Sequence, residues 1–201
     1  MPRPSTPSDE FWQELTALIL EEGISGITLG QIASRLKCSR RRLYEIADTK
    51  EELFLKIAES TLRDMRETGW ADAARANDAS AKVLAYFNHG SKVAGLMSSK
   101  FLSDLESNEQ GRKLFDEHQR MRIQTLENFL VEEMAASTFV KHNVRFVSES
   151  ALLLIRALRD ENFRVASKVS FEQGLRELWE LLLFGLVVRP SERIGDSSSG
   201  A

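Results

Sequence analysis

Cysteine, proline and long apolar runs are scarce in this sequence of 201 residues. The single cysteine, Cys38, excludes an internal disulfide and a cluster of thiolate metal ligands. A lone thiol is ordinary in a reducing compartment, so we expect a cytoplasmic protein. No stretch reaches the ~18 apolar residues of a membrane span, and residues 1–7 lack the apolar core of a signal peptide. We therefore expect neither membrane insertion nor secretion.

Residues that break helices are few as well. Four prolines and eleven glycines leave few of the breaks that many short strands require, and no segment alternates apolar with polar residues. Hydrophobic residues make up 42% of the chain, which is enough to form a buried core. We therefore predict an all-α fold of about nine helices.

The sequence shows no recognisable set of residues for catalysis or metal binding. His89, His118 and His142 are scattered and lack the spacing of metal ligands. The glycines between residues 23 and 30 separate predicted helices and do not follow a strand, as a phosphate-binding loop would require. We expect no enzyme activity, no cofactor and no metal.

The positive charge is concentrated in one segment, although the whole chain carries a net charge of -3. Between Arg35 and Lys50 six cations face only Glu45 and Asp48, so this segment is +4 and the remainder is -7. Such a run is often only a solvated helix face, but a local field can attract nucleic acid whatever the total charge. The six cations are Arg35, Lys37, Arg40, Arg41, Arg42 and Lys50.

Two short predicted helices flank a tight turn in this region. Thr28 and Gln31 have the spacing of a capping box, and an apolar stripe follows as far as Leu36. Lys37–Ser39 is predicted to form the turn, with Ser39 as the cap of the next helix. Helix, turn and helix over residues 28–47 are typical of a DNA-binding helix-turn-helix.

Apolar periodicity and capping residues predict the other helices. The first helix starts near Thr6–Asp9 and ends at Gly23, and a joint covers about residues 70–80. Capping boxes are predicted at Thr49 with Glu52, at Ser107 with Gln110 and at Ser170 with Gln173, and the tail from residue 191 is expected to be disordered. The later helices are expected at about residues 49–69, 83–97, 101–105, 107–134, 144–158 and 171–188.

Residues 27–36 (ITLGQIASRL), Ser39, the Leu43–Tyr44 pair and residues 50–53 (KEEL) resemble the TetR (tetracycline-repressor-like) family of transcriptional regulators over the first 65 residues or so. The resemblance implies a homodimer with an N-terminal three-helix DNA-binding domain and a C-terminal helical domain for effector binding and dimerisation. It implies domains at residues 1–50 and 70–190, joined by a helix over 50–68, with a tail at 191–201. The helices at 144–158 and 171–188 would form the dimer.

Two residues depart from the family pattern. Lys37 occupies a turn position where the family usually has glycine, and a left-handed conformation there costs a non-glycine residue about 1 kcal/mol. Ala47 stands where the family usually has a bulky aromatic residue, so we expect less packing beneath Tyr44 unless Ile46 fills the space.

The predicted DNA contacts lie in and around the second helix of the motif. Successive helical residues diverge by ~100°, so the three arginines cannot all face the floor of the major groove. The resemblance implies phosphate contacts for Tyr44, Lys50 and Thr28, although Thr28 could act only as a cap. Cys38 could be a redox switch, but we interpret it as a small residue filling the turn. The predicted DNA-binding residues are Thr28, Arg40, Arg41, Arg42, Tyr44 and Lys50.

Aromatic, methionine and leucine side chains supply candidates for an effector pocket and a dimer interface. The pocket candidates, which could equally form ordinary core, are Trp70, Phe87, Met97, Phe101, His118, Met121 and Phe129. The predicted dimer face on the last helix comprises Leu175, Leu178, Trp179, Leu182 and Leu186.

Together these patterns predict a sequence-specific regulator of transcription whose partners are double-stranded DNA and a second copy of the chain. The resemblance makes it a repressor released by a small apolar effector. One alternative is a helical protein-interaction module that has lost DNA affinity, which the arginine cluster and the intact Leu43–Tyr44 pair argue against. The other is a helical enzyme, for which the catalytic residues are missing.

Overall fold

The computed structural model describes residues 9–77, 79–135 and 143–186. Every regular element in these ranges is an α-helix, so the all-α prediction is confirmed. Ten helices occur there, one more than the nine or so predicted. The additional helix is α9 (Glu161–Ser167), whose first turn is capped by Asp160 accepting from the Phe163 amide at 3.1 Å. None of the described helices combines the length and apolar character needed to cross a bilayer.

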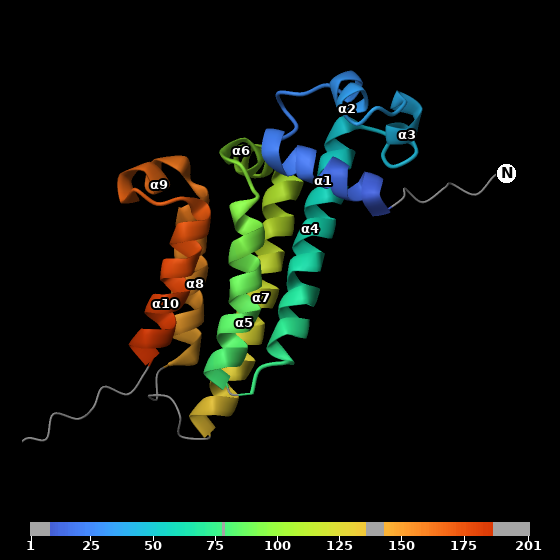
Figure 1. The fold of residues 1–201 in the computed structure, drawn as a ribbon. Coiled ribbons are helices and arrows are strands. Elements are labelled where there is room, and N and C mark those ends of the chain that lie inside the picture. The colour runs from blue at the N-terminus through green and yellow to red at the C-terminus, as the bar shows by residue number, and fades with distance from the viewer. Residues whose placement is uncertain (1–8, 78, 136–142, 187–201) are drawn as a thin grey trace, which may run out of the picture.

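Three helices form a cluster at one end of the molecule (Figure 1). They are α1 (Asp9–Glu22), α2 (Leu29–Arg35) and α3 (Arg40–Tyr44). α1 ends as predicted at Gly23, whose φ of +68° is accessible to glycine without strain. The cluster has its own apolar interior, which includes Leu15, Ile19, Ile32 and Leu43.

The long helix α4 (Lys50–Ala73) runs from this cluster along the rest of the molecule (Figure 1). It begins at the predicted cap, where the Thr49 hydroxyl accepts from the Glu52 amide at 3.0 Å. The prediction that it ends at Gly69 is wrong, because α4 continues for four more residues. A Cβ at Gly69 would lie 2.9 Å from the Tyr86 carbonyl oxygen, so this glycine allows a close approach of α5 and does not end the helix.

Alongside α4 lie α5 (Ala79–Gly95) and α7 (Glu109–Ala135), while α6 (Ser99–Ser107) lies between them and the cluster (Figure 1). The predicted capping box at Ser107 is wrong, because Ser107 is the last residue of α6. Asn108 caps α7 instead, its side-chain oxygen accepting from the Gly111 amide at 2.9 Å.

The last two long helices, α8 (Val144–Arg159) and α10 (Phe171–Leu186), pack side by side and are joined through α9 (Figure 1). The predicted capping box of α10 is confirmed by reciprocal bonds between Ser170 and Gln173 at 2.9 and 3.1 Å. The predicted first turn near Thr6, the helix beyond Leu186, His142 and the tail lie outside the described residues.

Candidate nucleic-acid interface and the buried core behind it

The turn between α2 and α3 has the conformation that the sequence predicts. Lys37 has φ +49°, which is left-handed, so it carries the expected strain of a non-glycine residue of about 1 kcal/mol. The Cys38 amide donates to the Ala33 carbonyl at 2.9 Å, and the Cys38 side chain is half-buried against the core. This placement fits the interpretation of Cys38 as a residue filling the turn.

Side chains cap both helices of the motif. The Thr28 hydroxyl accepts from the Gln31 amide at 3.3 Å, while the Thr28 amide donates to Gln31 Oε1 at 2.9 Å, which confirms the capping box. The Ser39 hydroxyl accepts from the Arg42 amide at 3.3 Å. Thr28 is exposed as a residue, and its hydroxyl also donates to Gln31 Oε1 at 2.9 Å.

The three consecutive arginines of α3 lie in different surroundings. Arg40 and Arg41 are exposed, whereas the guanidinium of Arg42 lies 3.9 Å from the centre of the Phe11 ring on α1. Arg41 pairs with Glu45 at 3.5 Å, but nine-tenths of its side chain is accessible, so solvent screens the pair. Arg40 and Arg41 are therefore accessible to solvent, whereas Arg42 is used partly for packing.

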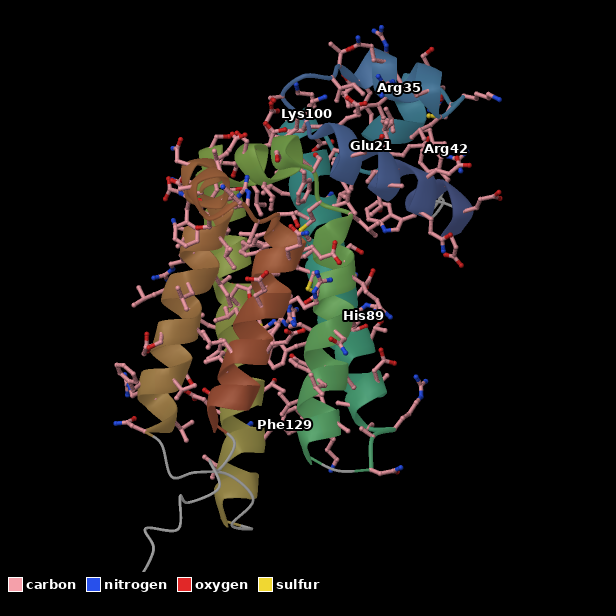
Figure 2. The ribbon with its side chains drawn as sticks, turned by 60° about the vertical axis from the view of Figure 1, so that its left-hand side comes forward. Glu21, Arg35, Arg42, His89, Lys100 and Phe129 are labelled. Atoms are coloured by element: carbon pink, nitrogen blue, oxygen red, sulfur yellow. The ribbon has the colours of Figure 1, made fainter. Side chains whose placement is uncertain are left out.

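Arg40 lies against the first turn of α2. A Cβ at Gly30 would be 2.5 Å from Arg40 Nη2, so the absence of a side chain at Gly30 leaves room for the guanidinium. Arg35, at the other end of α2, pairs with Glu22 at 3.2 Å. Figure 2 shows Arg35 and Arg42 in this N-terminal cluster, far from His89 and Phe129 on the long helices.

The other predicted DNA contacts border the same motif. Tyr44 is 52% exposed at the end of α3. Lys50 is half-buried, and its ammonium donates to the Ile27 carbonyl at 3.2 Å, which ties α4 to the α1–α2 link. Ala47 is buried, and Ile46 packs against the same core, as expected if Ile46 fills space left by the missing aromatic residue.

A hydrogen-bonded junction joins this cluster to α6. Asp104 accepts from the backbone amides of Ile24 and Ser25 at 2.5 and 3.0 Å. The Ser98 amide donates to the Leu20 carbonyl at 2.9 Å, one turn earlier in α1. Sequence reasoning missed this junction, because Asp104 and Ile24 are eighty residues apart and no local pattern pairs them.

An ion-pair network surrounds the junction on its exposed side. Glu22 pairs with Arg35 at 3.2 Å and with Lys100 of α6 at 3.3 Å. The Arg35 guanidinium, followed by the Lys100 ammonium, lowers the pKa of Glu22 below its ordinary value. Figure 2 places Lys100 at the boundary between α6 and the N-terminal helices.

Arg122 lies in the interior, among α4, α5 and α7. Its side chain is 2% exposed, and it makes a weak hydrogen bond to the Met65 sulfur at 3.4 Å. The guanidinium lies 4.9 and 5.6 Å from the ring centres of Phe87 and Tyr86. Burial lowers the pKa of Arg122 to about 10, opposed by Tyr86, so the charged form costs the fold about 3 kcal/mol.

His118 lies one turn before Arg122 on α7. Its Nδ1 is 2.8 Å from Arg66 Nη1 on α4. Burial, then Arg122 and Arg66, lower the pKa of His118 well below 6.5, and only the Leu62 carbonyl opposes them. The ring is therefore neutral near pH 7. Because a guanidinium can only donate, Nδ1 is the acceptor and the ring proton is on Nε2.

A second buried arginine, Arg159 at the end of α8, has acidic partners. It pairs with Glu106 of α6 at 3.0 Å and with Asp116 of α7 at 2.8 Å. Its guanidinium also lies 5.0 Å from the centre of the Phe115 ring. Arg159 thus joins three helices through paired charges, although its Nη1 has no hydrogen-bond partner.

The arrangement of these helices was compared with that of known proteins. No family model matches the sequence, and no curated protein matches it either. A putative transcriptional regulator from Saccharomonospora viridis, solved in complex with choline, superposes with a TM-score of 0.70 at 14% identity, over 89% of this chain and 96% of that one. The TetR-family regulator PfmR from Thermus thermophilus gives 0.63 at 18% identity, over 90% and 100%. The fold is that of TetR-family regulators.

A further solved structure with this fold is the fatty acid degradation regulator FadR from Bacillus halodurans, with a TM-score of 0.64 at 16% identity. It matches 90% of this chain and 100% of its own length. The matches extend well past the helix-turn-helix, so the TetR fold accounts for the N-terminal cluster and for most of the helices behind it.

The predicted pocket residues do not line a single cavity. Phe87 stacks on Trp179 at 3.6 Å, and Phe101 packs 5.2 Å from Phe54, measured between ring centres. Met121 is exposed on α7, whereas Met97 lines a groove of ~310 Å³ near α9. Four members of the predicted set therefore lie in different places within the TetR fold.

Of the other three predicted pocket residues, Trp70 and Phe129 are in contact, whereas His118 lies elsewhere on α7. Trp70, half exposed, packs edge-on against Phe129 and Tyr86, with ring centres 5.6 and 5.9 Å away. His118 is buried beside Arg122, as described above. Sequence reasoning included His118 but missed Arg122 and Tyr86, because an arginine on a helix is normally expected at the surface.

Three residues of the predicted dimer face are buried inside the chain, which corrects that assignment. Leu175, Leu178 and Trp179 are each 5% exposed or less. α10 is apolar on more than one side, and this side packs on α5. Leu182 is half-buried, and the Leu186 side chain lies outside the described part of α10.

A different apolar surface of α8, α9 and α10 is open to solvent. Leu154, Phe163 and Leu181 line a groove of ~390 Å³ between these helices. Leu153 and Leu181 are 63% and 66% exposed. We call this surface, together with Val165, which is also exposed on α9, the α8–α10 face.

In the described part of the chain no cluster of three or more His, Cys, Asp or Glu side chains is arranged to hold a metal.

Proposed function

We propose that the protein is a DNA-binding regulator of transcription, a repressor that a small-molecule effector releases. The observation that carries the proposal is a helix-turn-helix on a TetR fold, with Arg40 and Arg41 exposed on its second helix. An α-helix fits the major groove, which is roughly 12 Å wide, and arginine is the commonest side chain to read guanine there.

The surroundings of the three arginines suggest separate roles. Arg40 and Arg41 would contact base edges or phosphates, because both are exposed. Arg42 would hold α3 against α1 through its contact with Phe11. Tyr44, Lys50 and Thr28 would contact phosphates at the edges of the motif.

We expect two copies of the chain to dimerise through the α8–α10 face and to bind DNA as a dimer. Leu153, Leu154 and Leu181 are large apolar side chains that are exposed on this face, and contiguous exposed apolar surface often marks a protein–protein interface. Two-fold symmetry would place the two DNA-binding heads about one helical turn apart, roughly 34 to 36 Å or slightly more. Replacing Leu181 with Asp should shift the mass measured by light scattering from dimer to monomer, whereas Glu180→Asp, at the adjacent exposed position, should not.

The helices behind the DNA-binding head would form the effector-binding and dimerisation domain, over residues 70–190. A solved regulator with this fold holds choline, which supports a small-molecule site. The head is attached through α4 and through the hydrogen bonds of Asp104, so a ligand that moves α4 or α6 would reorient it. A regulator that binds DNA must share a compartment with that DNA, which agrees with the expected cytoplasmic location.

Selection of genomic fragments by the purified protein tests the proposal. We expect enrichment of fragments that share a two-fold symmetric site with half-sites about one turn apart. Recovery that is independent of sequence, or no recovery at 50 mM salt, would overturn it and favour the alternative of an interaction module without DNA affinity. Footprinting of the enriched fragments would then identify the regulated genes.

A further inference from the structure

Arg122 is enclosed by hydrogen-bond donors that lack acceptors. Four buried polar atoms in this part of the core make no hydrogen bond of good geometry, namely Tyr86 Oη, His118 Nε2, Arg122 Nη2 and Trp179 Nε1, although the Tyr86 oxygen favours the charged form of Arg122 and the Leu62 carbonyl that of His118. They come from α5, α7 and α10, and the Phe87 ring, stacked on Trp179 at 3.6 Å, links Trp179 to the guanidinium. One buried acceptor, Gln119 Oε1, also lacks a partner.

No protein carboxylate neutralises this charge in the described residues, since the groups that shift the pKa of Arg122 are Tyr86, Arg66 and burial itself. Buried polar groups in native proteins almost always have partners, and an unpaired buried cation is especially unfavourable. Several unpaired donors around one cation call for an acceptor-rich anion.

We propose that this donor cluster, Tyr86, His118, Arg122 and Trp179, binds the carboxylate of a small-molecule effector that has an apolar or aromatic body. The inference rests on the proposed function, because it specifies the chemistry of the effector. It also replaces the purely apolar effector expected from the sequence.

Charge and geometry select a carboxylate. A guanidinium forms two parallel hydrogen bonds with a carboxylate, and the neutral His118 ring offers its Nε2 proton as a further donor. A cationic ligand would be repelled by Arg122 and by Arg66 on α4, while an uncharged apolar ligand would leave the donors unpaired. The rings of Phe87 and Trp179 provide an apolar surface for the body of the ligand.

The enclosure of Arg122 connects ligand binding to the DNA-binding head. Because its side chain is 2% exposed, a ligand reaches the guanidinium only if the surrounding helices separate. Two contacts of the cluster, Met65 and Arg66, belong to α4, which continues into the head. A carboxylate that separates α4 from α5 or α7 on binding would therefore shift the helix that positions α2 and α3.

Thermal unfolding of the full chain with paired probes tests the inference. Octanoate and benzoate should each raise the Tm at neutral pH, whereas octanol and benzyl alcohol at equal concentration should raise it much less. Arg122→Met should abolish the difference between acid and alcohol. Arg120→Met, at an exposed position of the same helix, should preserve it, and Arg122→Lys should retain a several-fold weaker response.

The free protein supplies a second measurement. Arg122→Met should unfold at a higher Tm than the wild type without ligand, because it removes an unpaired buried charge. A merely structural arginine would give a lower Tm, so a destabilised or unfolded variant would overturn the proposal. Equal shifts with acids and alcohols, or no shift with either acid, would overturn it too.

DNA binding of the same protein separates this inference from the proposed function. Octanoate or benzoate should weaken binding to the selected operator by at least tenfold in the wild type and leave Arg122→Met unaffected. Operator binding without any response to carboxylates would overturn the inference and leave the regulator intact. A carboxylate-dependent Tm without DNA binding would overturn the regulator.

Discussion

Arg159 of α8 and Arg122 of α7 are both buried, but only the charge of Arg159 is paired with acidic side chains. Arg159 is 8% exposed and pairs with Glu106 and Asp116, so its charge joins three helices. Arg122 is 2% exposed and has no acidic partner among the described residues. The first arrangement is what stability requires, whereas the second weakens the fold and is understandable if a ligand completes it.

The largest effect is expected at Arg159, the arginine whose charge is paired. Arg159→Met would leave Glu106 and Asp116 without their shared cation, and we expect it to lower the free energy of unfolding by about 3 kcal/mol. Urea denaturation measures the loss. Arg156→Met removes a more exposed partner of Asp116 and should cost less than about 1 kcal/mol. If Arg159→Met and Arg156→Met lowered the free energy of unfolding equally, the buried ion pairs of Arg159 would not be specially stabilising. The contrast with Arg122 would then be lost.

Asp104 extends the comparison to a buried carboxylate whose hydrogen bonds come from backbone amides. Asp104→Ala would leave the Ile24 and Ser25 amides unpaired, and we expect a loss of about 2 kcal/mol in urea denaturation. Because these amides belong to the head, operator affinity should fall as well. The exposed Asp64→Ala should change neither quantity, and an unaffected operator affinity for Asp104→Ala would show that the junction does not position the head.

His118 gives a smaller effect that depends on pH. Its pKa is lowered in the folded state, so the unfolded chain binds the proton more readily. Its contribution is therefore complete above about pH 6.5 and is lost as pH falls below that value, by up to about 1.4 kcal/mol per pH unit. Urea denaturation between pH 7 and 5 should show a slope that His118→Gln removes and His89→Gln retains. An unchanged slope in His118→Gln would mean that His118 binds protons equally in the folded and unfolded states, which would contradict its lowered pKa.

Sequence reasoning succeeded where structure is determined locally. The caps at Thr28, Ser39, Thr49 and Ser170 were all predicted, because a cap depends on residues within one turn. The left-handed turn at Lys37 was predicted for the same reason.

It failed where distant segments decide the outcome. Gly69 resembles a helix stop, but its function is to admit the Tyr86 backbone of α5. The inward side of α10 could not be distinguished from its outward side, because both are apolar and only the position of α5 buries Trp179. Arg122 lacks an acidic partner because of the residues of α4 and α5 that surround it, and the local sequence around Arg122 does not identify these neighbours.

The salt dependence of operator affinity tests the central claim most directly. Fluorescence anisotropy between 50 and 200 mM KCl should show a steep fall in wild-type affinity, because bound cations release counterions from DNA. Replacing Arg40, Arg41 and Arg42 together with Ala should weaken binding strongly and flatten the logarithmic slope by about two. Alanine at the exposed Arg63, Arg112 and Arg120 should change neither quantity. Unchanged affinity and slope in the α3 variant would contradict DNA binding through this motif.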